Sequence, residues 1–291
     1  MQFVNRTHRL ARGLEAYWLS NEGSGDTVQD VSGNGHHGIF FGDAAWTAGD
    51  SGSAIYFPGT PYGDADNECI NVPASTRFDS GAASGEITVL CSFRPDIADD
   101  NPLVAKWEYS TGDWAFIWDG DVGQKSLRLY IGPAFTVVVL DTANNADISL
   151  GAWHTAGFTK LGSDYAGYMD GVCVETENNA LTWTDDRPLT IGAMYTDGNY
   201  AMNGAINWVM IFNRALSAGE MAYLTANPSC MFERPTPELW VGAGGEPPAG
   251  NPQFITIIMS RLPAWLAVGM IITVLAVAMG CDVNGVKRKA A

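Results

Sequence analysis

The chain has 291 residues, a formal net charge of −16 at pH 7, and only 16% charged residues. Hydrophobic residues make up 46% of it, and ten residues are tryptophan, which is too apolar and too aromatic for a disordered chain. The length fits one large β domain with additional segments.

The charge is unevenly distributed along the chain. Residues 1–12 contain three arginines and no acid, and residues 255–291 have a net charge of +3. Residues 13–254 contain 9 basic and 31 acidic side chains, so this body has a net charge of −22. Such a surface repels phosphate backbones, and we therefore expect no nucleic-acid partner. It is compatible with divalent cations and with neutral ligands such as sugars.

Short apolar segments, separated by Gly, Asp, Asn and Pro, follow a basic N-terminal arm formed by residues 1–12. They are rich in Val, Ile, Phe, Tyr and Trp, which predicts an all-β fold with two antiparallel sheets packed as a sandwich. The expected strands are residues 14–19, 37–41, 54–57, 69–72, 86–94, 103–107, 114–118, 126–131, 136–140, 153–160, 165–169, 172–177, 189–193 and 205–213.

Two local signals are strong enough to predict a connection and a helix. Asp170 and Gly171 lie between two predicted strands, and a two-residue turn with positive φ at both positions favours such a pair. Ser217 is followed three residues later by Glu220, which forms a capping box. We therefore expect a tight hairpin at 170–171 and one short helix over 218–225.

The five cysteines have neither CxxC spacing nor a metal-ligand pattern. Cys91 and Cys173 lie in apolar runs, so we expect both to be small buried hydrophobic residues. A disulfide between Cys69 and Cys230 remains an alternative. The fifth, Cys281, lies near the C-terminus.

The composition changes after residue 227. The sandwich is expected to span residues 13–234, followed by a Pro/Gly-rich linker over 235–261. Residues 262–280 carry no charge, and as a helix they would be about 28 Å long, close to the thickness of a bilayer core. We predict a transmembrane helix there, with a basic tail over 281–291. A buried core helix and a lipoprotein-like signal ending before Cys281 are the alternatives.

The orientation of this predicted anchor stays open. Lys287, Arg288 and Lys289 favour a cytoplasmic C-terminus. Residues 1–12 lack the apolar core of a secretory signal, which instead favours a cytoplasmic body.

Seven segments occur in an order that is typical of one known family. They are 13–40 (GLEAYWLSNEGSGDTVQDVSGNGHHGIF), 54–59 (AIYFPG), 87–95 (ITVLCSFRP), 153–159 (WHTAGFT), 168–172 (YMDGV), 191–193 (IGA) and 203–221 (NGAINWVMIFNRALSAGEM). In these segments the chain resembles laminin G-like domains of the concanavalin A-like lectin/glucanase superfamily. The resemblance implies a jelly-roll sandwich. It does not specify the function, because the fold occurs in lectins, hydrolases, adhesion modules and virion proteins.

The resemblance also implies a calcium site near the first loop and the last long strand. Ca²⁺ prefers six to eight oxygen ligands, and the corresponding candidates are Asn21, Asp30, Asn34 and Asn207. Asn21 and Asn207 stand where family members have Asp, so each exchange removes a negative charge. A loop closed by Asx hydrogen bonds is the alternative to bound calcium.

Three of the four histidines, His36, His37 and His154, are expected to have structural roles. The first two are adjacent, so their side chains point apart, and no third metal ligand is evident. His154 follows Trp153 within a predicted strand, which places it in the core or at a turn.

Catalytic carboxylates of the superfamily's glucanases alternate along one strand as ExDxE, so that they face the same cleft. No such triplet occurs here; the nearest pair, Glu175 and Glu177, is expected to form a solvated strand face, and Asp119 and Asp121 a turn. We therefore expect a domain without catalytic activity.

Sugar binding requires an aromatic platform beside planar polar groups, because a pyranose has an apolar face and a ring of hydroxyls. The densest cluster of this kind is also open to interpretation as core packing. It consists of Trp107, Tyr109, Trp114 and Trp118 with Asp113 and Asp119.

The sequence thus favours a non-catalytic carbohydrate-binding or adhesive jelly roll, anchored to a membrane through residues 262–280, with a glycan or a surface protein as its partner. The alternative is a structural virion protein, such as a capsid decoration or tail component, that contacts virion subunits or forms a homo-oligomer. Residues 227–240 (NPSCMFERPTPELW) carry this alternative, since they resemble the tail of phage-associated members.

Overall fold

The computed structural model describes residues 4–59, 68–79, 85–107, 113–121, 125–132, 137–140, 146–181, 183 and 187–232. The chain divides into two units, Met1–Glu233 and Arg234–Ala291. The predicted linker, membrane span and basic tail at 235–291 lie outside the described residues. Within the described part, no helix is long and apolar enough to cross a membrane.

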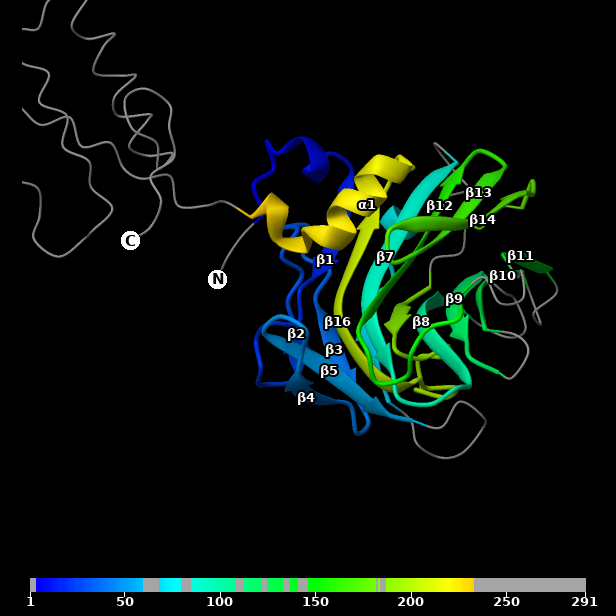
Figure 1. Cartoon of the computed structure of the whole chain (residues 1–291). Coiled ribbons are helices and arrows are strands. Elements are labelled where there is room, and N and C mark those ends of the chain that lie inside the picture. Colours follow the sequence, from blue (N-terminus) through cyan, green and yellow to red (C-terminus); the bar gives the residue numbers. More distant parts are fainter. Residues whose placement is uncertain are drawn as a thin grey trace, which may run out of the picture. The chain divides into compact units, whose positions relative to one another are not determined.

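Two eight-stranded sheets form the first unit, and their strand pairs are antiparallel (Figure 1). The first, sheet I, has the order β14 (Val172–Asn178), β13 (Asp164–Met169), β12 (His154–Leu161), β7 (Glu86–Pro95), β16 (Asn203–Phe212), β5 (Ser53–Pro58) and β4 (Ala45–Ala48), and β1 (Leu14–Trp18) also pairs with β16. The second, sheet II, has the order β11 (Val137–Leu140), β10 (Ser126–Ile131), β9 (Trp114–Asp119), β8 (Asp100–Lys106), β15 (Leu189–Ile191), β6 (Cys69–Val72), β3 (Gly38–Phe41) and β2 (Thr27–Val28). This confirms the predicted all-β, two-sheet sandwich.

The main hydrophobic core lies between the two sheets. Alternate residues of each strand point inward, because successive side chains of a strand face opposite sides. Sheet I contributes Phe93 and Phe158, and sheet II contributes Trp114 and Phe116; all four are fully buried. Phe116 and Phe158 meet edge to face, with their centroids 5.2 Å apart, so they join the two layers.

The two local signals in the sequence are both confirmed. Asp170 has φ +50 and Gly171 has φ +78, and Met169 pairs with Val172, so β13 and β14 form the predicted tight hairpin. The helix α1 (Ala218–Ala226) begins with the complete capping box of Ser217 and Glu220.

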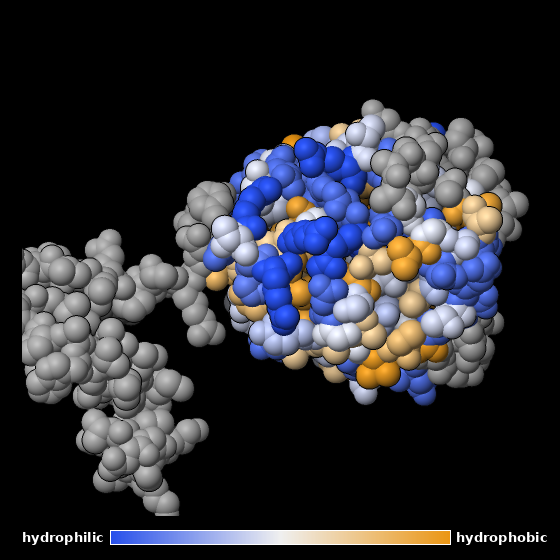
Figure 2. Space-filling model, turned by 90° about the horizontal axis from the view of Figure 1, so that it is seen from above, coloured by the Kyte–Doolittle hydropathy of each residue, from blue (hydrophilic) through white to orange (hydrophobic). Residues whose placement is uncertain are grey.

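The outer face of sheet I is covered by α1 and by both ends of the described chain. Met221 and Leu224 of α1 are buried in a second hydrophobic cluster, together with Tyr168 and Trp208 of sheet I. The short helices η1 (Arg9–Ala11) and η4 (Pro228–Met231) lie beside α1 (Figure 1). Figure 2 shows the molecule from above the view of Figure 1. On this side hydrophobic residues are exposed next to strongly hydrophilic ones. The residues of the predicted N-terminal arm from 4 onward therefore pack against the sandwich.

The structure corrects the sequence-based expectation at two strands and one cysteine. The short edge strands β2 and β4 were not predicted, since neither has a strong apolar alternation. Cys91 is buried as expected, but Cys173 is exposed because β14 is the edge strand of sheet I. Cys69 and Cys230 are both free thiols, so the alternative disulfide is not formed.

Candidate functional site

Two of the tryptophans predicted to bind a sugar are core residues. Trp114 and Trp118 both point inward from β9 and are 0% and 1% exposed. The Trp114 ring lies 5.6 Å from Phe158 and 5.9 Å from Trp183, and the Trp118 indole donates a hydrogen bond to the Ala146 carbonyl (2.9 Å). Neither ring has an exposed face on which a pyranose could stack, so the prediction is corrected at these two positions.

The other predicted sugar-binding residues lie on or near the outer face of sheet II. Trp107 is 4% exposed and packs against Ala105 and Ala115, while Tyr109 lies outside the described residues. Asp113 and Asp119 are buried: the first lies 3.7 Å from the Lys106 ammonium, and the second forms an ion pair with the Arg128 guanidinium. Both carboxylates therefore interact with cationic side chains of the protein itself.

Three tyrosines that the sequence prediction missed surround Trp107. Tyr130, Tyr195 and Tyr200 are half-buried and pack against the cluster that contains Trp107. The ring centroids of Trp107 and Tyr130 are 6.5 Å apart, and those of Tyr195 and Tyr200 are 5.8 Å apart. We call Trp107 with these three tyrosines the tyrosine surface.

The loop between β15 and β16 carries two of these tyrosines. The Met194 amide donates to the Tyr200 carbonyl (3.2 Å), and the Gly198 amide donates to the Tyr195 carbonyl (2.9 Å), so the loop forms a tight turn. Asn71 of β6 donates from its amide to the Thr196 carbonyl (2.9 Å), which holds the turn over sheet II. Tyr200 has φ +55, an unusual value for a bulky residue, and such strain is often kept at functional sites.

Charged groups on the same face of sheet II extend the tyrosine surface. The Arg128 guanidinium lies 3.5 Å from the Tyr130 hydroxyl and also pairs with Asp119. Asp100 stands directly opposite Asp119 in the ladder between β8 and β9. Burial, and secondarily the negative charge of Asp119, raises the pKa of the Asp100 carboxyl to about 6. Arg128 thus connects Tyr130 to Asp119, and Asp100 lies beside Asp119 further along the same face of sheet II.

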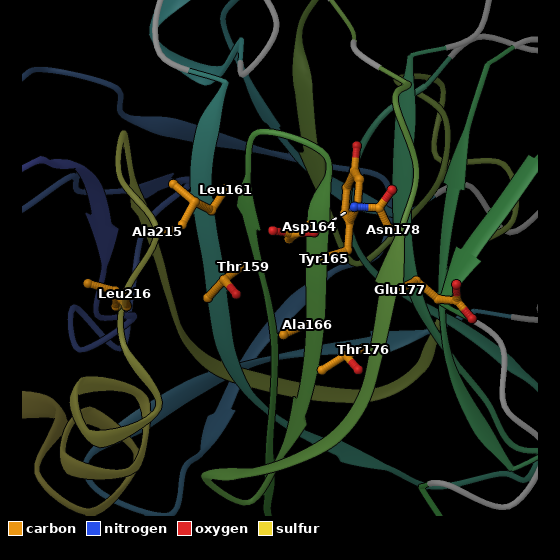
Figure 3. A pocket seen from close by; sticks show the side chains of 10 residues that line it. All are labelled: Thr159, Leu161, Asp164, Tyr165, Ala166, Thr176, Glu177, Asn178, Ala215 and Leu216. Atoms are coloured by element: carbon orange, nitrogen blue, oxygen red, sulfur yellow. Dashed lines mark hydrogen bonds between the residues drawn. The ribbon is translucent and has the colours of Figure 1, made fainter.

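A separate groove of about 530 Å³ lies on the outer face of sheet I (Figure 3). Thr159, Ala166 and Thr176 are neighbours across β12, β13 and β14, so their small side chains form its floor. Asp164 accepts a hydrogen bond from the Asn178 amide (2.6 Å) at one end. The complete lining consists of Thr159, Leu161, Asp164, Tyr165, Ala166, Thr176, Glu177, Asn178, Ala215 and Leu216.

The predicted carboxylate pair Glu175 and Glu177 lies on the edge strand β14. Glu177 is exposed and its side chain points away from the groove (Figure 3). A glycosidase requires two carboxyl groups that face each other across the scissile bond. Two acids that lie two positions apart on one edge strand do not provide this arrangement.

Asp30, a predicted calcium ligand, closes the first loop by hydrogen bonds. Its carboxylate accepts from the backbone amides of Tyr17 (3.0 Å), Ser32 (2.9 Å) and His36 (2.9 Å). Asn34 donates from its side-chain amide to the carbonyl of Glu15 (2.8 Å). Both side chains therefore act in the Asx-type loop that was the alternative to calcium.

The remaining calcium candidates also fit a metal poorly. Asn207 is 2% exposed, and its amide group donates to the carbonyls of Ser51 (3.3 Å) and Ser53 (2.6 Å). Ca²⁺ requires oxygen ligands. Asn207 instead directs its hydrogen-bond donors at the two carbonyls that could otherwise bind an ion. Asn21 is exposed. Among the described residues, no group of three or more His, Cys, Asp and Glu could hold a metal ion.

The three histidines are placed by structural contacts. The His36 ring packs against Phe78 with centroids 4.8 Å apart, and burial lowers the pKa of this imidazole. The His37 ring nitrogen accepts a hydrogen bond from the Asp30 amide (3.1 Å). His154 lies 2.8 Å from the Asp170 carboxylate at the β13–β14 hairpin.

Comparison with known proteins identifies both a family model and similar folds. A model of the concanavalin A-like lectin/glucanases superfamily matches residues 64–222, more than half of the chain. A search of curated protein sequences finds no match.

Three solved structures illustrate the similarity in fold. Domain 4 of AbnA, a GH43 extracellular arabinanase from Geobacillus stearothermophilus, solved with arabinotriose, is 17% identical with a TM-score of 0.55, over 73% of this chain and 98% of that domain. The binding domain of Paraclostridial Mosquitocidal Protein 1 is 16% identical with a TM-score of 0.57, over 75% of this chain and 52% of that one. The binding domain of botulinum neurotoxin DC, solved with SialylT, is 10% identical with a TM-score of 0.54, over 76% and 53%. The chain thus spans about half of each toxin domain, and at these identities the likeness concerns the fold.

Proposed function

Because the chain belongs to the concanavalin A-like lectin/glucanases superfamily, we propose that it is a non-catalytic carbohydrate-binding protein that uses the tyrosine surface to contact its glycan. Membership confirms the laminin G-like resemblance seen in the sequence. The superfamily includes both lectins and enzymes, so the proposal depends on the chemistry of this particular surface.

The observation that carries the proposal is the meeting of half-buried tyrosines with charged planar groups. Tyr130, Tyr195 and Tyr200 keep part of each ring accessible, and a pyranose can stack its apolar face on such rings. The Arg128 guanidinium beside Tyr130 and the Asp100 carboxylate offer hydrogen bonds to sugar hydroxyls. The buried Trp107 ring packs edge to face against Tyr130, which limits the side-chain entropy that Tyr130 loses on binding.

The similar structures support this class of ligand. The arabinanase domain was solved with arabinotriose and the neurotoxin domain with SialylT. Their different ligands agree with a fold whose loops set the specificity, which favours recognition of glycans in general over one particular sugar.

The proposed recognition does not depend on calcium at Asn21, Asp30, Asn34 and Asn207. Asp30 is already occupied by three backbone amides, and Asn207 directs its amide hydrogens at the nearby carbonyls. A chelator should therefore leave glycan binding unchanged.

A glycan array that includes arabinotriose, probed with the full chain, tests the proposal. We expect binding by the unaltered protein, a loss of about 5- to 30-fold in affinity for Tyr195→Ala, since one stacked ring contributes about 1–2 kcal/mol, and no change for Tyr223→Ala. Tyr223 is the matched control because it is an exposed tyrosine of α1, on the other sheet's side. Absence of binding to any glycan, or equal loss in both variants, would refute the proposal.

We also propose a membrane anchor for this binding domain, with a structural virion protein as the alternative. Both proposals are based on the sequence alone. Residues 262–280 would hold the domain at a membrane, with a surface glycan or protein as its partner. Extraction of membranes with alkaline carbonate tests this, because an integral anchor keeps the full chain in the pellet. Recovery of the full chain in purified virions, with release from membranes, would instead support the structural virion role.

A further inference from the structure

A lysine and two aspartates are buried together at one end of the sandwich. The Lys106 side chain is 0% exposed, and those of Asp79 and Asp113 are 6% and 1% exposed. The Lys106 Nζ lies 2.5 Å from Asp79 Oδ1 and 3.7 Å from Asp113 Oδ2. The amine of one residue is therefore in contact with the carboxyl group of a second and close to the carboxyl group of a third.

Buried aromatic residues neighbour this cluster along the chain and across the sheet. Lys106 is paired with Trp114 across the β8–β9 ladder, and Asp79 directly follows the buried Phe78. The Trp183 indole, which packs on Trp114, donates a hydrogen bond to the Phe78 carbonyl (3.4 Å). The amine and the two carboxyl groups are therefore held together with little exposure to solvent, and exclusion of water favours condensation over hydrolysis.

We propose that Lys106 and Asp79 react to form an intramolecular amide bond, with Asp113 as the group that transfers the protons. The Lys106 Nζ attacks the Asp79 side-chain carbon, a carbon–nitrogen bond forms, and the bond from that carbon to its hydroxyl oxygen breaks. Asp113 takes a proton from the nitrogen and returns one to the leaving hydroxyl, which departs as water. Nothing is oxidised or reduced, and Asp113 ends in its starting state.

The geometry favours this reaction because both reactants are held in contact before it starts. Two groups fixed at this distance react as if each were present at a very high concentration. The other lysines show which features matter. Lys125 contacts Asp147 at 2.6 Å, but 36% and 61% of these side chains are exposed, so water stabilises their charges. Lys160 is buried, but its Nζ donates to the carbonyls of Gly85 and Gly162 and contacts no carboxyl group among the described residues.

The bond would fix the segment after η2 (Thr76–Phe78) to the end of β8, across 27 positions of sequence. Trp107 follows Lys106 directly, so the brace would also anchor the tyrosine surface. A binding protein that must resist pulling or proteolysis gains from a covalent link, which limits the freedom of the unfolded chain as a disulfide does.

Intact mass spectrometry of the denatured full chain tests the proposal. We expect a mass lower than that of the sequence by one water molecule, and a tryptic peptide in which the segments of Asp79 and Lys106 are joined. Lys106→Arg should restore the full sequence mass, while Lys125→Arg, the matched exposed control, should keep the loss of water. An unaltered protein with the full sequence mass, or with these two peptides unlinked, overturns the proposal.

Two variants sharpen the chemistry. In Asp79→Asn the group attacked is a carboxamide and the leaving group is ammonia, so formation of the cross-link should release ammonia where the unaltered protein releases water. Asp113→Ala removes the proton-transferring group but neither reactant, and we expect at least a tenfold slower or absent cross-link in protein that still shows the β circular dichroism of the parent. A full cross-link in folded Asp113→Ala would overturn the role of Asp113.

Discussion

The outer faces of the two sheets differ in what covers them. On sheet I, α1 and the chain ends bury an extensive apolar cluster, and a groove floored by threonines and alanine remains. On sheet II, among the described residues, the loop from β15 to β16 packs on the alanines of β8 and β9, and three tyrosines stay half-buried, with Tyr130 beside Arg128. One face is therefore sealed mainly by hydrophobic packing, whereas the other presents rings and charges to solvent.

This difference indicates that one face of the sandwich contributes mainly to stability and the other mainly to ligand recognition. Residues that seal sheet I contribute to stability through buried area, and their replacement leaves a cavity. Tyr195 and Tyr200 of the tyrosine surface lie on the loop between β15 and β16 and are partly exposed, so their side chains can contact a ligand at little cost in stability. Variants on the two faces should accordingly change different measurements.

The largest expected effect concerns the core that both faces share. Trp114→Ala should lower the free energy of unfolding by about 3–5 kcal/mol, because the fully buried ring contacts Phe158 of sheet I and Trp183. The midpoint of equilibrium urea unfolding measures this change. A loss below about 1 kcal/mol would contradict the inward position of Trp114 and would reopen its role as a sugar platform.

The next effect separates the two faces directly. Met221→Ala should lower the free energy of unfolding by about 2–5 kcal/mol, since Met221 is 0% exposed between α1 and sheet I. Glycan affinity of the folded variant should stay unchanged. Tyr195→Ala should do the opposite, with a loss in affinity and little change in stability. If both variants changed both quantities equally, the proposed separation of the faces would be wrong.

Most of the fold could be predicted because its signals are local. The Asp170–Gly171 turn and the Ser217–Glu220 capping box are each specified by adjacent residues, and both form as predicted. The edge strand β2 has only two residues, Thr27–Val28, which is too short for any periodic signal.

The candidate site was less accessible from the sequence because it is assembled from distant segments. Trp114 and Trp118 are four positions apart in one strand and therefore share a face of β9, but this spacing does not say whether that face is the core. Tyr130 between Leu129 and Ile131 carries the signal of an outward position, and TDGN before Tyr200 signals a turn. Nothing local shows that this turn folds onto the strand of Tyr130.

The buried carboxyl group of Asp100 on sheet II should make the stability of the protein depend on pH between about 4 and 6. Burial raises the pKa of Asp100 to about 6 in the folded protein, above the value of about 3.9 for an unfolded chain. The folded state then binds the proton more tightly, so this stabilising contribution is present below pH 4 and is lost as the pH rises through 6. Asp100→Asn should therefore be more stable than the parent by about 1 kcal/mol at pH 8, and the difference should vanish near pH 4.

Urea unfolding of both proteins at pH 4, 6 and 8 measures this pH dependence. Asp43→Asn is the matched control, because Asp43 is exposed in the turn between β3 and β4 and is not a neighbour of Asp100. A difference between Asp100→Asn and the parent that stayed the same from pH 4 to pH 8 would contradict the assignment.

The smallest expected effect concerns Glu220 at the start of α1, which covers sheet I. Its contribution to stability changes with pH in the opposite direction to that of Asp100. Hydrogen bonds from Arg214, with a smaller contribution from the Ser217 amide, lower the pKa of Glu220 to about 2. Its stabilising contribution is therefore present above the unfolded value of about 4.3 and is lost as the pH falls toward 2. Glu220→Gln should cost about 1 kcal/mol at pH 7 and nothing near pH 2, whereas Ser217→Ala should cost about 1 kcal/mol at both, since its hydroxyl cap carries no charge. Thermal unfolding at the two pH values distinguishes them, and parallel losses would mean that the cap alone, without the ion pair to Arg214, holds the start of α1.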